Sequence, residues 1–364
     1  MKISVIICEF NPLHYGHKRL IDFAKTISDK VVCVMSGNFV QRGMPAVANK
    51  YKRARHAVLA GSDLVVELPC SYATASAQDF ALGGVQIANA LGADFLVFGS
   101  ECGKIAPLAH CAEMLNSVDV NEKIRLELQR GVTYPKAVSN ALGTDVLDKP
   151  NNTLAVEYLR ALKTTASKIT PVTIAREDNF NSAPQQYASS TALRENAELR
   201  EKFTFDFVQK DIDDTIEQKY GEFSTRFLAT AEKDYLENVA GVSEGLHNRI
   251  FDADKTHGFE KMMSEIKTKR YTRASLNRIV LHAVLGIMKE QDTSVTSKKV
   301  SLHAEKISLN GEKIKVLAVN SGETQLLANP VLSTDTTFDE LTARADRLYA
   351  TLDGETPPIK LLKI

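Results

Sequence analysis

The sequence lacks several features that mark special classes of protein. It has no tryptophan, and its five cysteines form no CxxC pair. An odd number of isolated cysteines argues against a disulfide framework, so we expect free, buried thiols in a reducing compartment. No apolar run approaches the roughly 18 residues that a membrane-spanning helix needs. These absences predict a cytoplasmic protein without a membrane segment.

The chain also lacks an excess of charge of either sign. Lys+Arg and Asp+Glu number 45 each. This balance argues against a general affinity for nucleic acid, although a local basic patch remains compatible with it. With 44% hydrophobic and 25% charged residues over 364 positions, the composition is that of a globular protein large enough for two domains.

Apolar strands alternate with helices through the first hundred residues. Strands are expected at Ile3–Cys8, Lys30–Gly37, Asp63–Pro69 and Ala93–Glu101, and helices at about 17–27, Tyr51–Gly61 and 78–91. One more strand is expected at Pro171–Asp178. This alternation predicts an α/β, Rossmann-like fold with a parallel sheet covered on both faces.

Helical patterns dominate the rest of the chain. They fall at about 106–130, 188–195, 221–238, 243–253, 258–267, 272–289 and Thr337–Leu352, with two short strands expected at Lys313–Asn320 and nearby. The change of pattern near residue 200 predicts two domains, an α/β domain over residues 1–200 and a mainly α-helical domain over residues 201–364.

The stretch "ICEFNPLHYGHKRL" (Ile7–Leu20) joins the first strand to the first helix. In a parallel sheet, ligands bind at the carboxyl ends of the strands, and a helix that begins there favours phosphate. His14 and His17, with Gly16 between them, fall on one face of the first helical turn, where both imidazoles can donate to phosphoryl oxygens. A polar corner with a helix cap is the structural alternative. A metal pair is less favoured, because no third ligand stands near.

A second phosphate-binding pattern lies at "ASSTALRE" (Ala188–Glu195). Hydroxyls at a helix start and the guanidinium of Arg194 suit phosphate oxygens, although the same residues also fit a plain capping box. The sequence shows no convincing nucleophile, since no GxSxG elbow occurs and no cysteine has a histidine partner in the local pattern.

These motifs carry a resemblance to a known family. "HYGH" resembles the HxGH signature of the nucleotidyltransferase superfamily, and "SSTALR" resembles its second signature. "CEFNPLHYGH", "MSGNFVQRGMPAV", "DLVVELP", "FGSE", "KPNN" and "SSTALR", in that order, resemble the bacterial tRNA(Met) cytidine acetate ligases. The resemblance is strong over the first two hundred residues and weaker through "YTRASLNRIVLHAVLGI".

The resemblance implies an ATP-dependent, RNA-modifying enzyme. Such ligases form acetyl-adenylate from acetate and ATP, and then acetylate N4 of the wobble cytidine in the anticodon loop of elongator tRNA(Met). It implies catalytic roles for His14 and His17, and an ATP site built from Ile7, Cys8, Glu9, Phe10, Asn11, Pro12, Leu13, His14, Tyr15, Gly16, His17, Lys18, Arg19, Leu20, Gly99, Asn152, Arg176, Ser189, Ser190 and Arg194. Whether Asn151 or Asn152 contacts ATP stays open. Mg²⁺ is expected on the ATP phosphates, with no carboxylate cluster to mark a protein site.

Two further groups of residues are assigned more locally. Gln41 and Arg42, in the loop "SGNFVQRGMPA" after the second strand, are expected to close over acetate or the target cytosine, unless the loop is merely solvated. A basic run with an interleaved Tyr271 suits RNA phosphates and bases. Its members are Lys267, Lys269, Arg270, Arg273 and Arg278. A second basic run is Lys50, Lys52, Arg53 and Arg55, and a solvated helix face explains either run equally simply.

Two other functions share part of this pattern. A cofactor-making adenylyltransferase also uses HxGH and the second signature, but it does not require a large helical domain. A noncatalytic nucleotide-binding or tRNA-binding protein would need fewer phosphate donors than His14, His17 and Arg194 provide.

Overall fold

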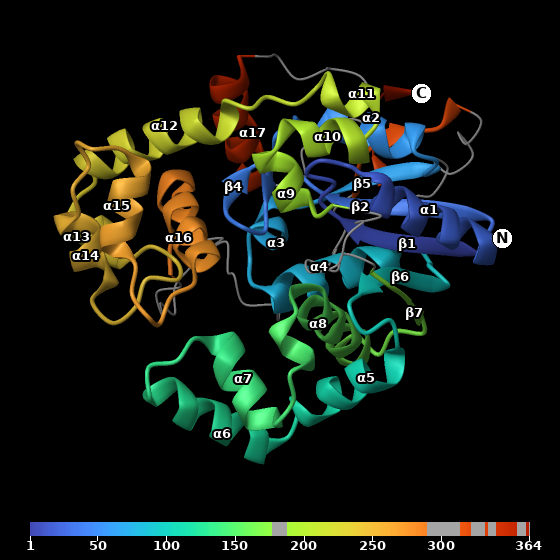
Figure 1. Cartoon of the computed structure of the whole chain (residues 1–364), viewed down its shortest axis with the longest axis horizontal. Coiled ribbons are helices and arrows are strands. Elements are labelled where there is room, and N and C mark those ends of the chain that lie inside the picture. Colours follow the sequence, from blue (N-terminus) through green and yellow to red (C-terminus); the bar gives the residue numbers. More distant parts are fainter. Residues whose placement is uncertain (177–187, 290–313, 322–331, 334–339, 355–361, 364) are drawn as a thin grey trace.

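A mainly parallel sheet forms the centre of the protein in the computed structural model (Figure 1), which describes residues 1–176, 188–289, 314–321, 332–333, 340–354 and 362–363. The parallel strands are β1 (Ile3–Cys8), β2 (Lys30–Ser36), β5 (Leu64–Leu68), β6 (Phe95–Ser100) and β7 (Thr170–Ala175). The strand order is β10-β8-β5-β2-β1-β6-β7. From β1 the chain moves outward to β2 and β5 and then returns to β6 on the other side of β1. The order of the strands therefore reverses at β1, where ligands bind in such sheets.

The far end of the chain completes this sheet. Strand β8 (Ile314–Val319) lies antiparallel to β5, and β10 (Leu362–Lys363) and β9 (Leu332–Ser333) both pair with β8 in parallel. The predicted strand near Lys313–Asn320 is therefore present, but it extends the N-terminal sheet. A boundary at residue 200 divides this sheet, so the two-domain division stays a prediction.

The two faces of the sheet are both buried, as the apolar strands predict. Alternate side chains of β1 point to opposite faces: Val5 and Ile7 join one core cluster, and Ile6 and Cys8 join the other. Helices α1 (Tyr15–Ile27) and α2 (Lys50–Leu59) supply the second cluster, while α4 (Ala77–Ala90) packs on the first. A Cβ on Gly84 of α4 would lie 2.5 Å from the Ile7 side chain, so this close helix–strand contact requires glycine.

A helical layer follows β6 in sequence. It contains α5 (Ile105–Met114), α6 (Val118–Gln129), α7 (Tyr134–Leu142), the 3₁₀ turn η1 (Val146–Asp148) and α8 (Pro150–Thr164). The predicted helical region over 106–130 is present and consists of two helices separated by residues 115–117. Helix α8 is not predicted from the sequence, because proline and asparagine in "KPNN" favour turns. Pro150 instead occupies the first turn of the helix, where its missing N–H costs nothing.

Shorter helices make up most of the second half, gathered largely to one side of the sheet (Figure 1). They are α9 (Ser190–Glu195), α10 (Ala197–Phe203), α11 (Asp206–Gln209), α12 (Ile216–Thr230), α13 (Lys233–Glu237), α14 (Leu246–Asp252), α15 (Phe259–Ile266), α16 (Arg273–Leu285) and α17 (Glu340–Asp353). The helix predicted over Thr337–Leu352 corresponds to α17, although residues 337–339 lie outside the described part. Within the described residues, no helix has the length and apolar character needed to cross a bilayer.

A small hairpin connects the sheet to the helical half. Its strands are β3 (Phe39–Val40) and β4 (Met44–Pro45), and between α2 and α4 the chain also forms the short helix α3 (Cys70–Ala73). Gly43, at the hairpin turn, has φ +71°, and a Cβ there would lie 2.3 Å from the backbone nitrogen of Arg278 in α16. Glycine is therefore needed both for the turn and for the contact.

Candidate active site at the carboxyl end of β1

The histidine corner begins directly after β1 and forms the start of α1. His14 is the N-cap: its Nδ1 accepts from the Gly16 N–H at 3.1 Å. His17 Nδ1 accepts in return from the His14 backbone N–H at 3.3 Å. The two rings stack with centroids 3.7 Å apart. This reciprocal pair is a capping box made by imidazoles. The same two histidines can therefore cap the helix through Nδ1 and still offer Nε2 to a ligand.

The capping bonds fix which nitrogen of each ring carries the proton. Because Nδ1 accepts a hydrogen bond in both residues, each neutral imidazole must hold its proton on Nε2. Burial, with a contribution from the charge of Arg176, lowers the pKa of His14 to about 3, and burial also lowers the pKa of His17. His14 Nε2 is buried and has no partner among the described residues. The corner thus presents a neutral N–H donor ready for a ligand oxygen.

The second signature lies against this corner, as predicted. Ser189 is the N-cap of α9 and accepts from the Ala192 N–H at 3.3 Å, and Ser190 begins the helix. Arg194 Nη1 donates to the Asn11 carbonyl oxygen at 2.5 Å, and its side chain is only 8% exposed. Arg194 therefore joins two motifs that are 183 residues apart in the chain.

Gly99 and Arg176 also meet at this edge of the sheet. Gly99 lies near the end of β6 and pairs with Ile174 of β7, two residues before Arg176. A Cβ on Gly99 would lie 3.1 Å from the Arg176 side chain, so glycine leaves room for that arginine. Since the charge of Arg176 acts on both His14 and His17, the guanidinium belongs to the same site. The predicted strand end at 177–178 lies outside the described residues.

The paired asparagines at the start of α8 have structural partners. Asn152 Oδ1 accepts from the Cys102 N–H at 3.1 Å, and its Nδ2 donates to the Val146 carbonyl at 2.9 Å. Asn151 Nδ2 donates to Glu101 at 2.8 Å. Both side chains thus hold the loop after β6 onto α8. A direct ATP contact by either stays a prediction, and these bonds give both residues a positioning task that the sequence did not reveal.

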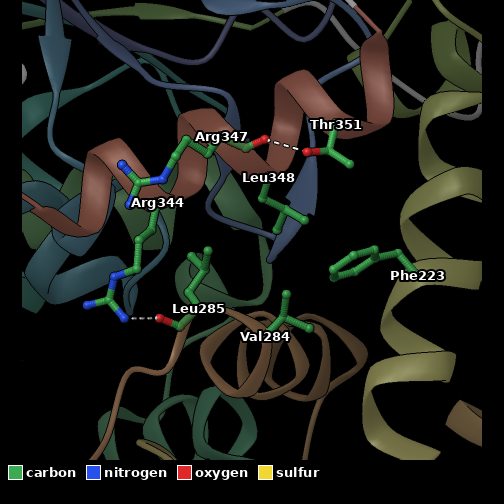
Figure 2. Close-up of a pocket in the computed structure, with 7 residues that line it drawn as sticks. All are labelled: Phe223, Val284, Leu285, Arg344, Arg347, Leu348 and Thr351. Carbon is green, nitrogen blue, oxygen red and sulfur yellow. Dashed lines mark hydrogen bonds between the residues drawn. The ribbon is translucent and has the colours of Figure 1, made fainter.

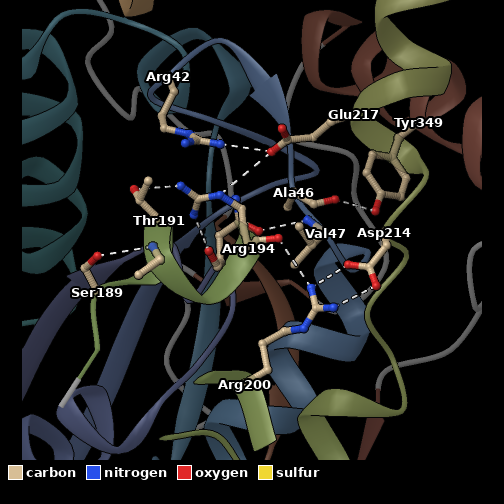
Figure 3. Close-up of polar contacts among 12 residues, drawn as sticks. Arg42, Ala46, Val47, Ser189, Thr191, Arg194, Arg200, Asp214, Glu217 and Tyr349 are labelled. Carbon is tan, nitrogen blue, oxygen red and sulfur yellow. Dashed lines mark hydrogen bonds and ion pairs between the residues drawn. The ribbon is translucent and has the colours of Figure 1, made fainter. Parts of the chain in front are cut away.

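The hairpin carrying Gln41 and Arg42 is held from two sides. The Gln41 N–H donates to Glu9 Oε1 at 2.7 Å, and its carbonyl accepts from Arg278 at 3.0 Å. Arg42 pairs with Glu217 of α12 at 2.9 Å, and Glu217 also lies 3.8 Å from Arg194 (Figure 3). The hairpin is therefore a packed bridge between the histidine corner and the helical half. Glu217 is a residue of this site that sequence reasoning missed, because no local motif surrounds it.

The structure changes the picture of both basic runs. Lys50 and Arg53 are buried, so the second run is not a solvated patch and that candidate is wrong. Arg53 donates to the carbonyls of Glu9 and Ala48 at 2.5 and 2.9 Å, which ties α2 to the end of β1.

In the basic run between Lys267 and Arg278, most of the arginines already have partners. Arg270 pairs with Glu244 and Arg273 with Glu260, while Arg278 contacts the hairpin. Lys267 and Lys269 are exposed, and no ion pair involving them occurs among the described residues. The charge available to RNA on this surface is therefore smaller than the sequence predicts, and Arg278 serves the hairpin contact.

A separate open pocket of about 260 Å³ lies between α12, α16 and α17 (Figure 2). Its lining residues are Phe223, Val284, Leu285, Arg344, Arg347, Leu348 and Thr351. None of the site residues predicted from the sequence lines it. In the described ranges, no group of three or more His, Cys, Asp or Glu side chains could hold a metal ion.

Comparison with known proteins agrees with this geometry. Residues 1–356 match the family model described as HIGH Nucleotidyl Transferase. The chain is 37% identical over 321 residues to the tRNA(Met) cytidine acetate ligase of Caldicellulosiruptor saccharolyticus, covering 82% of this chain and 80% of that protein. It is 32% identical to the ligase of the same name from Staphylococcus carnosus, over 98% of this chain and 96% of that one.

The chain belongs to the tRNA(Met) cytidine acetate ligase family.

A solved structure shares the fold of this ligase family member. It is Thermotoga maritima TmcAL bound with alpha-thio ATP, with a TM-score of 0.85 and 24% identity over 100% of both chains. The likeness over the full length confirms the α/β nucleotidyltransferase fold together with its helical C-terminal part.

Proposed function

We propose that this protein activates acetate with ATP and transfers the acetyl group to N4 of the wobble cytidine in elongator tRNA(Met). The observation that carries the proposal is the buried, unpartnered Nε2 of His14, at the point where the strand order reverses and where Arg176 and Arg194 also converge. Family membership supports the substrates, because the curated relatives are named for a tRNA(Met) cytidine and acetate.

The arrangement suits adenylation in a direct way. An acetate oxygen attacks the α-phosphorus of ATP and pyrophosphate leaves, so negative charge grows on the phosphoryl oxygens. The Nε2–H groups of the histidines and the guanidiniums of Arg176 and Arg194 are the donors of this corner that would stabilise such charge. We propose that Mg²⁺ arrives with ATP and is held by its phosphates.

One assay tests the proposal against its runner-up. The protein is incubated with labelled acetate, ATP and an elongator tRNA(Met) transcript, and N4-acetylcytidine is measured in the digested RNA. Label in RNA that depends on ATP supports the ligase. Pyrophosphate release that instead requires a small phosphorylated substrate, such as a nicotinate mononucleotide or phosphopantetheine, would favour the adenylyltransferase.

Arg42 is expected to serve acetate or cytosine binding from the hairpin. Arg42→Ala should lower acetylation by about 10-fold or more, because a charge-assisted hydrogen bond is worth roughly 1.5–3 kcal/mol. Steady-state kinetics with varied acetate and varied tRNA would tell which substrate is affected. Glu217→Gln is the matched control, since it removes the partner of Arg42 and keeps the arginine. Full acetylation by Arg42→Ala would exclude this residue from the mechanism.

The exposed lysines after α15 are proposed to contact tRNA phosphates. Lys267→Glu/Lys269→Glu should weaken tRNA binding and reduce the salt dependence of the binding constant by roughly one to two phosphate contacts. Acetate-dependent pyrophosphate exchange should be unchanged. The control is Lys163→Glu/Lys168→Glu, which reverses two exposed lysines at the end of α8 and just after it. If both double variants weakened tRNA binding equally, the loss would reflect the change in net charge and not a contact made by Lys267 and Lys269.

A further inference from the structure

The transfer half of the reaction needs a group that the adenylation half does not. The amino nitrogen of cytosine is a weak nucleophile because its lone pair is delocalised into the ring, and it must lose a proton when it becomes an amide. A carboxylate that accepts a hydrogen bond from this amino group makes the nitrogen more nucleophilic and can take the proton. This inference rests on the proposed function, and the question is which carboxylate of the site is available.

Most carboxylates near the strand ends are already engaged. Both oxygens of Glu67 accept from Lys50 Nζ, at 2.7 and 2.9 Å. Both oxygens of Glu101 accept from the amides of Asn151 and Asn152. Glu217 is ion-paired with Arg42 at 2.9 Å and also lies 3.8 Å from Arg194, so it is already engaged as well.

Glu9 differs from all of these. Its Oε1 accepts from the Gln41 N–H at 2.7 Å, and among the described residues no hydrogen bond to its Oε2 occurs. The side chain is half-buried and stands directly after β1, five positions before His14. It therefore lies between the histidine corner and the hairpin, the two elements proposed to hold the phosphates and the acetyl group or cytosine.

We propose that Glu9 Oε2 accepts a hydrogen bond from the N4 amino group of the target cytosine and receives its proton during acetyl transfer. The nitrogen forms a bond to the acetyl carbon, and the bond from that carbon to the AMP oxygen breaks, with the electron pair leaving on AMP. The amino proton passes to Glu9, which becomes a neutral carboxylic acid. No oxidant, reductant or further reactant is needed.

The surroundings of Glu9 fit a base rather than a permanent ion pair. Burial raises the pKa of Glu9, opposed by the Gln41 N–H and by the charges of Arg42, Arg194 and Arg53. The other titratable groups close enough to interact are Cys8 and Tyr158, and burial raises the pKa of both, so both are neutral near pH 7. The net effect is a pKa of Glu9 above that of an ordinary glutamate, which favours a proton acceptor at this position.

The proposed contact between Glu9 and the N4 amino group also selects cytosine over uracil. Cytosine presents an N4 amino donor where uracil presents the O4 acceptor, so a carboxylate at this position attracts the former and repels the latter. Glu9 therefore acts both as proton acceptor and as the reader of the exocyclic amino group.

The test separates the two half-reactions with Glu9→Gln, whose side-chain oxygen keeps the bond from the Gln41 N–H. Adenylation is measured as acetate-dependent exchange of labelled pyrophosphate into ATP. Transfer is measured in a single turnover from enzyme-bound acetyl-adenylate to an elongator tRNA(Met) transcript. Exchange serves as the reference, because Glu9 also belongs to the segment implied to bind ATP. We expect Glu9→Gln to slow transfer by at least about 100-fold more than it slows exchange, the lower range for loss of a general base.

Two more measurements make the result specific. The wild-type transfer rate should rise with pH through one ionisation, which Glu9→Asp should retain and Glu9→Gln should lose. Full transfer by Glu9→Gln, or an equal loss of exchange and transfer, would overturn the role of Glu9. Wild-type protein that shows no acetate-dependent exchange would refute the proposed function itself, which is a separate result.

Discussion

The double variant His14→Asn/His17→Gln is expected to fold and to lose acetate activation by at least about 10³-fold, because each missing donor to a developing oxyanion costs about 10²–10³ in rate. Asparagine is a good N-cap, and glutamine at the third helical position completes a capping box. Both helix-starting bonds of α1 are therefore kept. What disappears is the Nε2–H that each imidazole directs away from the cap.

The matched variant is His14→Ala/His17→Ala, which loses donors and cap together. Its acetate activation should fall as much as that of His14→Asn/His17→Gln. Its free energy of unfolding should fall by about 1–2 kcal/mol more, because the double alanine variant also loses the helix cap. Pyrophosphate exchange and urea denaturation measure the two effects. Near-wild-type exchange in the cap-preserving variant would mean that the histidines only start the helix, and the proposed mechanism would be abandoned.

The pH profile of this step provides an internal check. Since the pKa of His14 is lowered to about 3, its imidazole is neutral throughout the range in which the enzyme can be assayed. No inflection from His14 is expected in the free enzyme between about pH 5 and 8, although an ordinary histidine titrates near 6.5. The low pKa of His14 also sets how stability depends on pH. The unfolded chain binds the proton more tightly than the folded one, so the free energy of unfolding falls as pH drops below about 6.5. A salt-bridged histidine would have the opposite effect.

Replacing Lys50 with methionine is expected to destabilise the fold by about 3–5 kcal/mol, because it leaves a buried carboxylate without its counter-charge. Lys50 and Glu67 are fully buried, and Lys50 Nζ also reaches Asp346 of α17 at 2.5 Å. This cluster ties α2, β5 and α17 together. Arg55→Met, exposed on the same helix, is the control and should change stability by no more than about 0.5 kcal/mol.

The penalty should depend on pH in a defined direction. Burial already raises the pKa of Glu67, and loss of Lys50 removes the largest opposing charge. In the variant the folded state therefore holds a proton on Glu67 at pH values where the unfolded chain has released it, so stability rises as pH falls toward the acid range. Urea denaturation at several pH values measures this, and the second change Glu67→Gln should recover part of the loss. A constant deficit at every pH would contradict an uncompensated carboxylate as the cause.

Much of the site could be predicted because its signals are local. A run of apolar residues ending at Cys8, followed by HxGH, is a strand-to-helix corner wherever it occurs, and the structure places His14 and His17 there. The second signature likewise forms a helix start, with Ser189 as its cap. What the local pattern could not show was that the imidazoles use Nδ1 for the cap, which fixes Nε2 as the donor.

The failures share a different physical origin. The sequence places Lys50 and Arg53 in a basic run but does not show their partners, which are remote: Asp346 lies 296 residues from Lys50, and the carbonyl of Glu9 lies 44 residues from Arg53. Arg278 likewise looked available to RNA until the hairpin at Gln41 was seen against it. A residue's type and spacing do not report what is packed on top of it.

The sequence by itself determined the alternating elements, the position of the histidine corner and the family, since these depend on periodicity and short motifs. Only the tertiary structure decided which charges are buried, that β8 closes the sheet in the antiparallel sense, and that Glu9, Arg42, Arg194 and Glu217 stand together. The physical reason is that burial and electrostatic pairing are set by contacts between segments far apart in the chain, which no window along the sequence contains.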